Sequence, residues 1–360
     1  MINPTDFLGQ TLVRHLARDG WKIYALSHAD ERPAVEALRR RLAAREEEGG
    51  GSDLEVLWGD PVSVGAGLDS RTIDAISREV DTIFNCPPLM AGDRARYAAV
   101  LDSVVKGTDQ VISLAHRFPN LKALAQVSTV FVSGNYSGRF YEDWLDVGQS
   151  FYVPLHRNHF VAETKLRSAA RALPVVVLRC GLLVGEAETG ECREGEGLLP
   201  FFAALSRYAR AVPRPMPLLA PDSEHKILAF TPNDYCARAI LKLVESPESL
   251  GRTFCLVDPA GPSVRSFVDA MGDLMGRTCY RLSVDMLYKM PFMEPLFMVE
   301  WMSYLAHAVK RSSLPLRFLF QRGDYDTTGA KQLLAGSAVA CPPFTEYLER
   351  LYRYYLTRYA

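Results

Sequence analysis

Apolar positions follow two different spacings over the first 185 residues. Short runs rich in valine, leucine and isoleucine predict buried strands, and longer segments with apolar residues three and four positions apart predict helices. We expect strands at 22–26, 54–57, 82–85, 123–127 and 174–179, and helices at 8–17, 33–45, 69–80, 94–117 and 160–172. Strands separated by helices are typical of a parallel sheet covered on both faces. The pattern therefore predicts an α/β fold with a doubly wound parallel sheet.

The pattern changes after residue 185. Residues 186–196 are polar and contain glycine, which predicts a surface loop, and residues 213–221 contain four prolines, which predicts an extended connector. Further on we expect helices at 233–245 and 264–275, a strand at 253–257, and a helical, aromatic segment from 286 onward. We therefore expect one domain over 1–185, to which 225–258 returns, and a smaller, mixed but mainly helical lobe over 186–360.

Composition narrows the class of protein. The chain has 360 residues, 48% hydrophobic and 23% charged, with a net charge of −1. These values exclude disorder and collagen, and they provide no overall field that would attract nucleic acid. The N-terminus lacks a signal-peptide pattern, and no clean apolar run of membrane-spanning length is present. We expect a soluble, cytoplasmic protein, and the content of alanine and arginine is typical of a high-GC bacterium.

The cysteines argue against metal or disulfide chemistry. The chain has seven, scattered and without a Cys-x-x-Cys pair. Paired spacing is the usual sign of a zinc site or a disulfide framework. We therefore expect reduced thiols and no metal.

Eight segments, in order along the chain, carry a resemblance to a known family. They are DFLGQTLVRHL at 6–16, GDP at 59–61, KGT at 106–108, VSTVFVSG at 127–134, EDWLDVGQSF at 142–151, TK at 164–165, RCGLLVGEAETGE at 179–191, and DYDTTGAKQLL with CPPFTEYL within 324–348. Together they resemble the extended short-chain dehydrogenase/reductases, most closely the thioester-reductase and fatty-acyl-reductase (male-sterility-like) branch. The resemblance implies a Rossmann-like nucleotide-binding domain, NADP or NAD as cofactor, and a substrate lobe at the C-terminal end.

The loop that binds the cofactor in this family departs from its pattern here. The family has three glycines spaced GxxGxxG, which let backbone N–H groups approach a pyrophosphate. In this chain Gly9 is the glycine that remains, while Asn3 and Asp6 stand at the other two positions. Asp6 either brings a negative charge to the phosphates or caps the helix that follows. The resemblance assigns cofactor contacts to Asn3, Thr5, Phe7, Leu8, His28, Asp60, Pro61, Cys86 and Lys165.

The sequence does not distinguish which cofactor binds. His28 and its neighbours contain neither a clear ribose-binding acid nor a clear phosphate-binding arginine, so NADP and NAD are not distinguished and the absence of a cofactor remains an alternative.

The family's first strand precedes the loop, and of it this chain retains Met1 and Ile2. Either the true start lies upstream or the protein has dispensed with the strand, and we favour the first explanation.

Catalysis in the family uses a Ser or Thr, a Tyr, and a Lys four residues after the Tyr. The resemblance places Thr129 with Ser128 at the first position and Lys165 at the last, but Val161 stands where the Tyr belongs. His159 is an alternative proton carrier, weighed against an ordinary surface or capping role. Tyr136 and Tyr152 are other candidate donors, and Val104 replaces the family's water-holding Asn.

The C-terminal lobe carries the substrate prediction. Five of the ten methionines fall within 286–302, among aromatic residues, which indicates either core packing or a lid over a hydrophobic acyl or polyketide-like substrate, free or bound to a carrier. Three functions stay open: an NAD(P)-dependent reductase of a thioester, aldehyde or related carbonyl; a cofactor-independent lyase, cyclase or isomerase; and a non-catalytic scaffold. We expect no nucleic-acid or membrane partner, and the resemblance is compatible with a helix-bundle homodimer.

Overall fold

The main sheet is parallel, and its strand order confirms the doubly wound prediction. The computed structural model describes residues 1–46, 53–89, 97–151, 153–222, 227–283 and 323–359. One part of the sheet pairs β2 (Leu54–Trp58) with β1 (Ile23–Ser27), and the other has the order β10-β6-β4-β3. In that part β3 spans Thr82–Asn85, β4 Ala123–Thr129, β6 Val175–Cys180 and β10 Thr253–Leu256. β10 pairs with β6, so this segment from beyond residue 186 lies in the main sheet.

Ile2 connects the two parts of the sheet. It forms parallel bridges with Leu26 of β1 and with Asn85 of β3. Its backbone N–H donates to the Phe84 carbonyl at 2.9 Å, and the Met1 carbonyl accepts from the Leu26 N–H at 2.8 Å. Ile2 therefore lies between β1 and β3 in the centre of the sheet, which gives the order β2-β1-Ile2-β3-β4-β6-β10.

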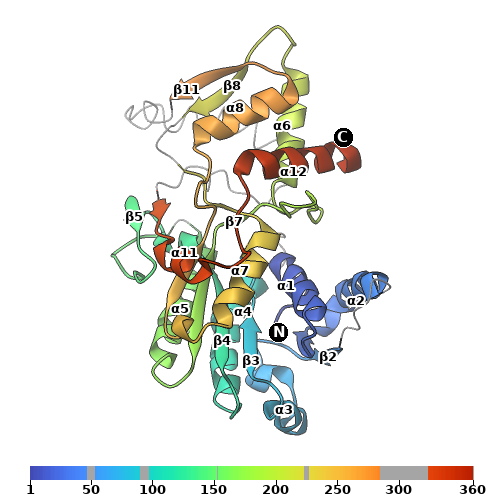
Figure 1. Cartoon of the computed structure of the whole chain (residues 1–360), viewed down its shortest axis with the longest axis vertical. Coiled ribbons are helices and arrows are strands. Elements are labelled where there is room, and N and C mark those ends of the chain that lie inside the picture. The colour runs from blue at the N-terminus through green and yellow to red at the C-terminus, as the bar shows by residue number, and fades with distance from the viewer. Residues whose placement is uncertain (47–52, 90–96, 152, 223–226, 284–322, 360) are drawn as a thin grey trace.

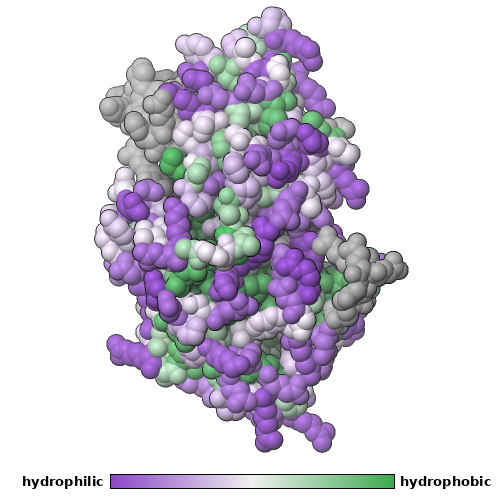
Figure 2. Space-filling model, in the orientation of Figure 1, coloured by the Kyte–Doolittle hydropathy of each residue, from purple (hydrophilic) through white to green (hydrophobic). Residues whose placement is uncertain are grey.

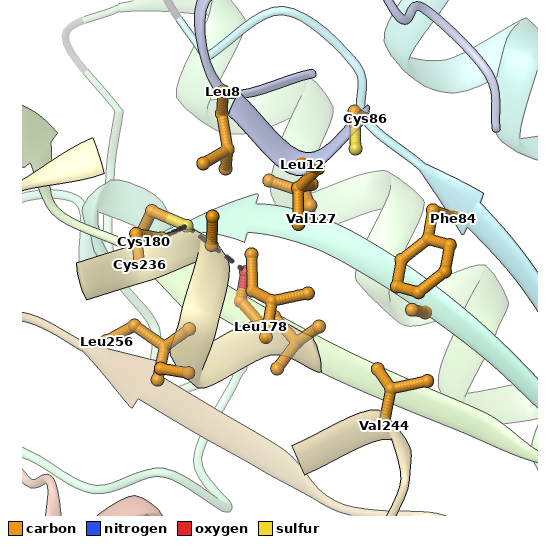
Figure 3. Close-up of a cluster of buried hydrophobic side chains, with 14 of the residues drawn as sticks. Leu8, Leu12, Phe84, Cys86, Val127, Leu178, Cys180, Cys236, Val244 and Leu256 are labelled. Carbon is orange, nitrogen blue, oxygen red and sulfur yellow. Dashed lines mark hydrogen bonds between the residues drawn. The ribbon is translucent and has the colours of Figure 1, made fainter. Parts of the chain in front are cut away.

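Helices cover both faces of the sheet, because alternate residues of each buried strand point to opposite sides. One face packs against α1 (Phe7–Arg18), α2 (Arg32–Glu46), α7 (Asn233–Val244) and α11 (Thr328–Leu334). The other packs against α3 (Ser70–Ser77), α4 (Tyr97–Ala115) and α5 (Pro154–Ala169). In β4, Leu124 faces α4 while Ala125 belongs to the core under α1 and α7. Figure 3 shows the core between the sheet and helices α1 and α7, where Leu8 and Leu12 of α1 lie against Val127 and Leu178 of the sheet.

A second lobe lies beyond the carboxyl ends of the strands (Figure 1). It contains α6 (Leu199–Ala211), α8 (Val264–Met275), α12 (Phe344–Tyr359) and the parallel pair β8 (Leu218–Asp222) and β11 (Cys279–Ser283). Aromatic rings hold it together: Phe202 of α6 lies 5.4 Å from Tyr352 and 5.8 Å from Tyr355 of α12, between ring centroids. Two further parallel pairs, β5 (Gly138–Phe140) with β12 (Gly323–Tyr325) and β7 (Leu182–Leu183) with β9 (Phe230–Thr231), lie near the junction.

Several predicted boundaries were wrong. α5 begins at Pro154, six residues before the predicted start at 160, because proline at the first helical turn is compatible with a helix. The proline-rich connector becomes β8 from Leu218 onward, since β11 offers it a pairing partner. The loop at 186–196 is not simply a surface loop, because Ala187 and Cys192 within it are buried. Tyr152 and the methionine-rich segment 286–302 lie outside the described residues.

The surface is mixed in polarity. On the face shown in Figure 2, hydrophilic residues predominate and hydrophobic ones occupy small areas between them. Among the helices that the structure describes, none is both long and apolar enough to cross a membrane.

Candidate functional site

Four of the predicted site residues lie at the carboxyl edge of the main sheet, where its parallel strands end. Thr129 closes β4, His28 follows β1, Asp60 follows β2, and Cys86 follows β3. The loop after Ile2 leads at the same edge into α1. In open parallel sheets this edge is where ligands bind.

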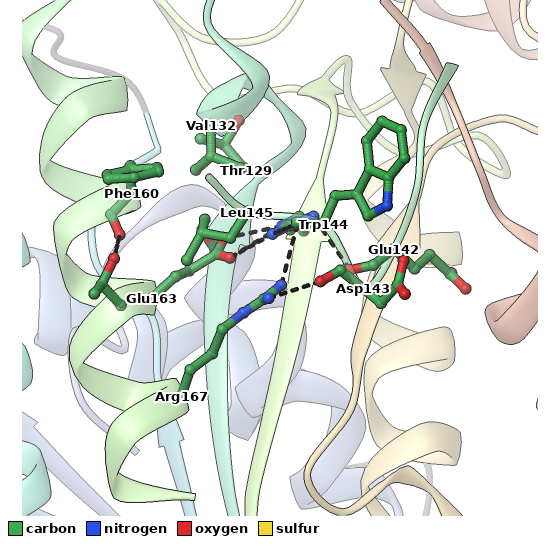
Figure 4. A network of polar contacts seen from close by, with 12 residues as sticks. Thr129, Val132, Glu142, Asp143, Trp144, Leu145, Phe160, Glu163 and Arg167 are labelled. Atoms are coloured by element: carbon green, nitrogen blue, oxygen red, sulfur yellow. Dashed lines mark hydrogen bonds and ion pairs between the residues drawn. The ribbon is translucent and has the colours of Figure 1, made fainter. Parts of the chain in front are cut away.

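A buried ion pair lies directly beneath the end of β4. The guanidinium of Arg179, on β6, donates to both carboxylate oxygens of Glu163 on α5, at 2.7–3.1 Å, and both side chains are fully buried. Arg179 also donates to the Trp144 carbonyl at 2.7 Å. Burial opposes the charge of Arg179, but the contact with Glu163 raises its pKa. Figure 4 shows Glu163 on its helix, facing the segment that carries Trp144.

The ion pair determines which of two neighbouring hydroxyl groups, that of Ser128 or that of Thr129, is available for chemistry. The Ser128 hydroxyl donates to Glu163 at 2.6 Å, so its proton is already used. The Thr129 hydroxyl instead accepts the Phe131 N–H at 3.3 Å, which leaves its own proton without an acceptor among the described residues. Both residues are buried. Thr129 is therefore the better candidate to hold a substrate oxygen.

Lys165 is paired with an acid on the neighbouring helix α4. Its ammonium donates to both carboxylate oxygens of Asp109 on α4, at 2.6 and 2.7 Å. The side chain is 36% exposed and lies at the contact between α4 and α5. Val161, one turn earlier on α5, has no hydroxyl whose pKa a lysine could lower. A Tyr–Lys proton relay is therefore not assembled at these positions.

The buried face of α5 carries two histidines instead. His159 is fully buried, and its Nε2 lies 3.0 Å from the carbonyl of Pro88, just after β3. Burial lowers the pKa of His159, and it lowers that of His156, one turn earlier, to about 3. Both rings are thus neutral at physiological pH. The surface or capping role that was the alternative for His159 is wrong, because the side chain lies inside the protein.

The loop from Asn3 to Asp6 adopts a glycine-like backbone conformation at Asn3 and approaches Gly9 closely. Asn3 has a φ of 56°, a left-handed conformation that glycine adopts most easily. A Cβ atom on Gly9 would collide with the Asn3 carbonyl, so the glycine at this position is needed for the close approach of α1. Asp6 is at the N-cap of α1 but makes no side-chain cap hydrogen bond, so it does not perform the capping role considered above.

The charges around this loop come from three side chains. Asp6 is half-buried, and burial raises its pKa to about 6, against the effect of the nearby Arg193. Arg193 donates to the Thr5 carbonyl at 2.8 Å and forms an ion pair with Glu196. Burial raises the pKa of Glu196 to about 8. An arginine and two acids therefore surround the N-terminus of α1.

The remaining predicted cofactor contacts make local interactions. The Asp60 carboxylate accepts from the Val62 N–H at 3.2 Å and from the Ser63 hydroxyl at 2.6 Å, so it caps its own turn, with Pro61 inside that turn. His28 is exposed and caps the short helical turn Ala29–Glu31. Phe7 and Leu8 begin α1, where Leu8 is buried in the core. Cys86 is buried, and burial raises the pKa of its thiol.

Sequence reasoning missed Glu163, Arg193 and Glu196, and considered Arg179 only as a departure from the family pattern. One signal was available for Arg179, since a charged residue inside the valine-rich strand 175–180 needs a buried partner. The part of the chain that the structure describes contains no group of three or more His, Cys, Asp or Glu side chains that could hold a metal ion.

Comparisons with known proteins agree with this architecture. The family model described as male sterility protein, an NAD-binding family, matches residues 4–240. A component protein of the linear gramicidin synthase of Brevibacillus parabrevis is 25% identical over 96% of this chain. The chloroplastic fatty acyl-CoA reductase 2 of Arabidopsis thaliana is 28% identical over 40% of it. The chain spans 7% and 26% of the lengths of these two relatives.

Solved structures match over almost the whole chain. The terminal R domain of the myxalamid PKS-NRPS pathway has a TM-score of 0.76 and 24% identity, covering 99% of this chain and 90% of that one. The reductase domain of a nonribosomal peptide synthetase from Mycobacterium tuberculosis has a TM-score of 0.72 at 20% identity, with the same coverage. The UDP-glucuronic acid 4-epimerase of Bacillus cereus, in complex with NAD, has a TM-score of 0.65 at 14% identity over 99% of this chain and 96% of that one. These likenesses show the fold, and the family match shows membership: the chain belongs to the male sterility protein family, a thioester-reductase-like branch of the extended short-chain dehydrogenase/reductases with a Rossmann fold.

Proposed function

We propose that this chain reduces an acyl group held as a thioester on a carrier, using NADPH or NADH as the hydride source. One observation carries the proposal: Thr129 ends a central strand, with a hydroxyl proton free to bind a carbonyl oxygen, in a chain that matches reductase domains along nearly its full length. The names of the relatives support the substrate class, since they are peptide-synthetase reductase domains and a fatty acyl-CoA reductase.

The backbone at the start of α1 fits the diphosphate of a dinucleotide. Asn3 has the left-handed conformation, Gly9 allows the close approach, and Asp6 does not cap the helix, so N–H groups of the first turn are available to an anion. Arg193 would add a positive charge beside Thr5. A bound nicotinamide would supply hydride. Asp6 and Glu196 would oppose the charge of the phosphates.

The chain's own residues would orient the acyl group. Thr129 would donate a hydrogen bond to the thioester oxygen, where negative charge develops during reduction. The ion pair of Arg179 and Glu163 keeps Ser128 bound, so Thr129 is presented alone. Because position 161 is a valine and not a tyrosine, we propose that the proton comes from water or from another proton donor next to the bound substrate.

The test is binding followed by turnover. The protein is titrated with NADPH and NADH by calorimetry, and oxidation of the bound cofactor is then followed with acyl-CoA and acyl-pantetheine thioesters of increasing chain length. We expect micromolar binding of one cofactor and thioester-dependent oxidation. Thr129→Val should lower kcat about 100-fold without changing cofactor affinity. Thr164→Val, which removes an exposed hydroxyl from α5, is the matched control and should leave both unchanged.

A second candidate is a cofactor-independent protein that binds or rearranges an acyl substrate. It is favoured by the pairing of Lys165 with Asp109 and by Val161 at the tyrosine position, because both remove parts of the redox site. Thioester turnover, or binding without turnover, in the complete absence of nicotinamide cofactor would support it. Failure of both cofactors to bind at millimolar concentration would overturn the reductase proposal.

A further inference from the structure

A folded strap joins β7 to α6 and lies against the start of α1. We define the strap as residues 186–197. The carboxylate of Asp234, on α7, accepts the N–H groups of Ala187 at 2.9 Å and Glu188 at 3.1 Å. Arg350 of α12 donates to the Ala187 carbonyl at 3.0 Å. The first part of the strap is therefore attached to two helices from different parts of the chain.

The strap is also attached to α1, and its far end is closely packed. Glu186 forms an ion pair with Arg14 of α1. Gly197 has a φ of 56°, and a Cβ atom there would collide with the Cys192 sulfur and the Val184 carbonyl. The Cys192 thiol donates to the Glu196 carbonyl at 3.2 Å. These contacts give the strap one defined conformation.

That conformation brings Arg193 and Glu196 to the N-terminus of α1. Arg193 donates to the Thr5 carbonyl at 2.8 Å, within the loop whose backbone fits a diphosphate. Its guanidinium is also paired with the Glu196 carboxylate. The second Glu196 oxygen is buried without a hydrogen-bond partner among the described residues. An internal cation and its counter-ion therefore lie beside the loop to which the proposed function assigns the diphosphate.

The balance of charge at this position is unfavourable for a phosphate. Arg193 acts on two acids, Glu196 on the strap and Asp6 at the start of α1, and Glu31, after β1, repels Asp6 in turn. Burial raises the pKa of Glu196 to about 8 and that of Asp6 to about 6, with their mutual repulsion adding to the effect. The site thus carries an acid that is partly protonated near neutral pH.

We propose that the strap closes the diphosphate site at the start of α1 with its own ion pair, and that Glu196 controls dinucleotide binding by holding Arg193. When Glu196 is charged, Arg193 is paired and a diphosphate meets net negative charge. When Glu196 is neutral, Arg193 is released to bind the diphosphate beside the first N–H groups of α1. The inference rests on the proposed function for the identity of the ligand alone.

The experiment measures binding by calorimetry for wild-type protein and Glu196→Gln. The probes are NADPH, ADP-ribose, which carries the diphosphate without nicotinamide, and inorganic diphosphate. We expect Glu196→Gln to bind all three about tenfold more tightly or better at pH 8.5, since one charge is removed and one is released. Glu194→Gln, an exposed acid on the same strap, is the matched control and should not change affinity.

A double variant separates release of Arg193 from simple loss of repulsion. Arg193→Gln combined with Glu196→Gln should return affinity to the wild-type level or below it. If the double variant keeps the tenfold gain, Arg193 is not the ligand and the proposal is wrong. Equal affinity of wild type and Glu196→Gln for inorganic diphosphate also overturns it, whatever the catalytic activity. If Glu196→Gln binds inorganic diphosphate more tightly but does not bind NADPH, the result supports control of the site by Glu196 and contradicts the proposed reductase function.

The pH dependence provides an independent readout. A raised pKa means that Glu196 takes up its proton as the pH falls through about 8, which releases Arg193. The affinity of wild-type protein for ADP-ribose should therefore rise between pH 9 and pH 7, while that of Glu196→Gln stays flat over the same range. A further rise near pH 6, from Asp6, should remain in both. A flat wild-type profile between pH 9 and pH 7 would contradict control by Glu196.

Discussion

At the scale of single residues, the buried charges distinguish this protein from an ordinary apolar core. Arg179 and Glu163 are fully buried and hydrogen-bonded to each other. Arg179 also donates to the backbone carbonyls of Glu142 and Trp144, and Glu163 accepts from the Ser128 hydroxyl. Two charges in such a place are costly to bring out of water, and removal of one leaves the other unpaired. The pair therefore acts as a unit that holds the end of β4 in place.

Arg179→Met should destabilise the protein by about 3–5 kcal/mol in urea unfolding, because Glu163 is left buried and unpaired. Lys165→Met, which breaks the half-exposed pair with Asp109 on the same helix, is the control and should cost less than about 1 kcal/mol. Combining Arg179→Met with Glu163→Met should recover much of the loss. If Arg179→Met and Lys165→Met lower the free energy of unfolding by similar amounts, the buried ion pair contributes no more to stability than the half-exposed one.

Stability should also depend on pH through Glu196 and Asp6. Burial raises their pKa values to about 8 and about 6. The folded protein therefore retains protons that the unfolded chain has released, so stability falls as the pH rises from about 4 to about 8. Thermal unfolding of wild type and Glu196→Gln across this range should show a smaller fall for the variant. Parallel curves would show that Glu196 does not titrate as described.

At the scale of elements, the centre of the main sheet depends on Ile2. β1 and β3 are joined at their carboxyl ends by this residue, through bridges to Leu26 and Asn85. Further along, the same two strands border a cavity of about 170 Å³, lined mainly by apolar residues that include Met1 and Trp21. Ile2 thus joins the two parts of the sheet at the edge that carries the candidate site.

Ile2→Ala should cost about 2–4 kcal/mol, because it removes a buried side chain next to an existing cavity. Urea unfolding followed by Trp21 fluorescence and by circular dichroism measures the loss. Val64→Ala, at a side chain that is 89% exposed, should change stability by less than about 0.5 kcal/mol. An equally small effect of Ile2→Ala would show that the two parts of the sheet are held together mainly by their helices.

At the scale of the whole molecule, Glu142 joins three distant segments. Its carboxylate accepts the N–H of Cys255 in β10 at 3.0 Å, and those of Gly329 at 2.7 Å and Ala330 at 3.2 Å in α11. The segment that contains Glu142 also provides backbone carbonyls to Arg179. One side chain thus ties the C-terminal part of the chain to the edge of the main sheet.

Glu142→Gln should destabilise the protein by about 2–4 kcal/mol, since an amide nitrogen would face N–H donors that it cannot satisfy. Asp143→Asn, an exposed neighbour, is the control and should have little effect. The loss is measured by denaturant unfolding, and limited proteolysis should find cleavage near α11 accelerated in Glu142→Gln. Unchanged proteolysis together with unchanged stability would contradict the role of Glu142.

Local patterns in the sequence were enough to establish the type and order of the elements over the first 185 residues. Valine-rich runs and the helical spacing of Leu8, Leu12 and Leu16 are such patterns, and burial of those apolar faces leaves a doubly wound sheet as the solution. The absence of two loop glycines and of the tyrosine, which Val161 replaces, was also evident from the sequence, because each motif position can be compared directly with the family pattern. Family membership followed from motifs in order along the chain.

The pairing of the charged groups, in contrast, became known from tertiary packing alone. Lys165 meets Asp109, Arg179 meets Glu163, and Arg193 reaches Thr5 across 188 positions of the sequence. No local pattern identifies the partner in any of these pairs, because each pairing depends on where helices and the strap pack. The same packing places Ile2, one of the two residues that the sequence retains of the family's first strand, in the centre of the sheet. Distant contacts of this kind determine which groups of the site are free to act.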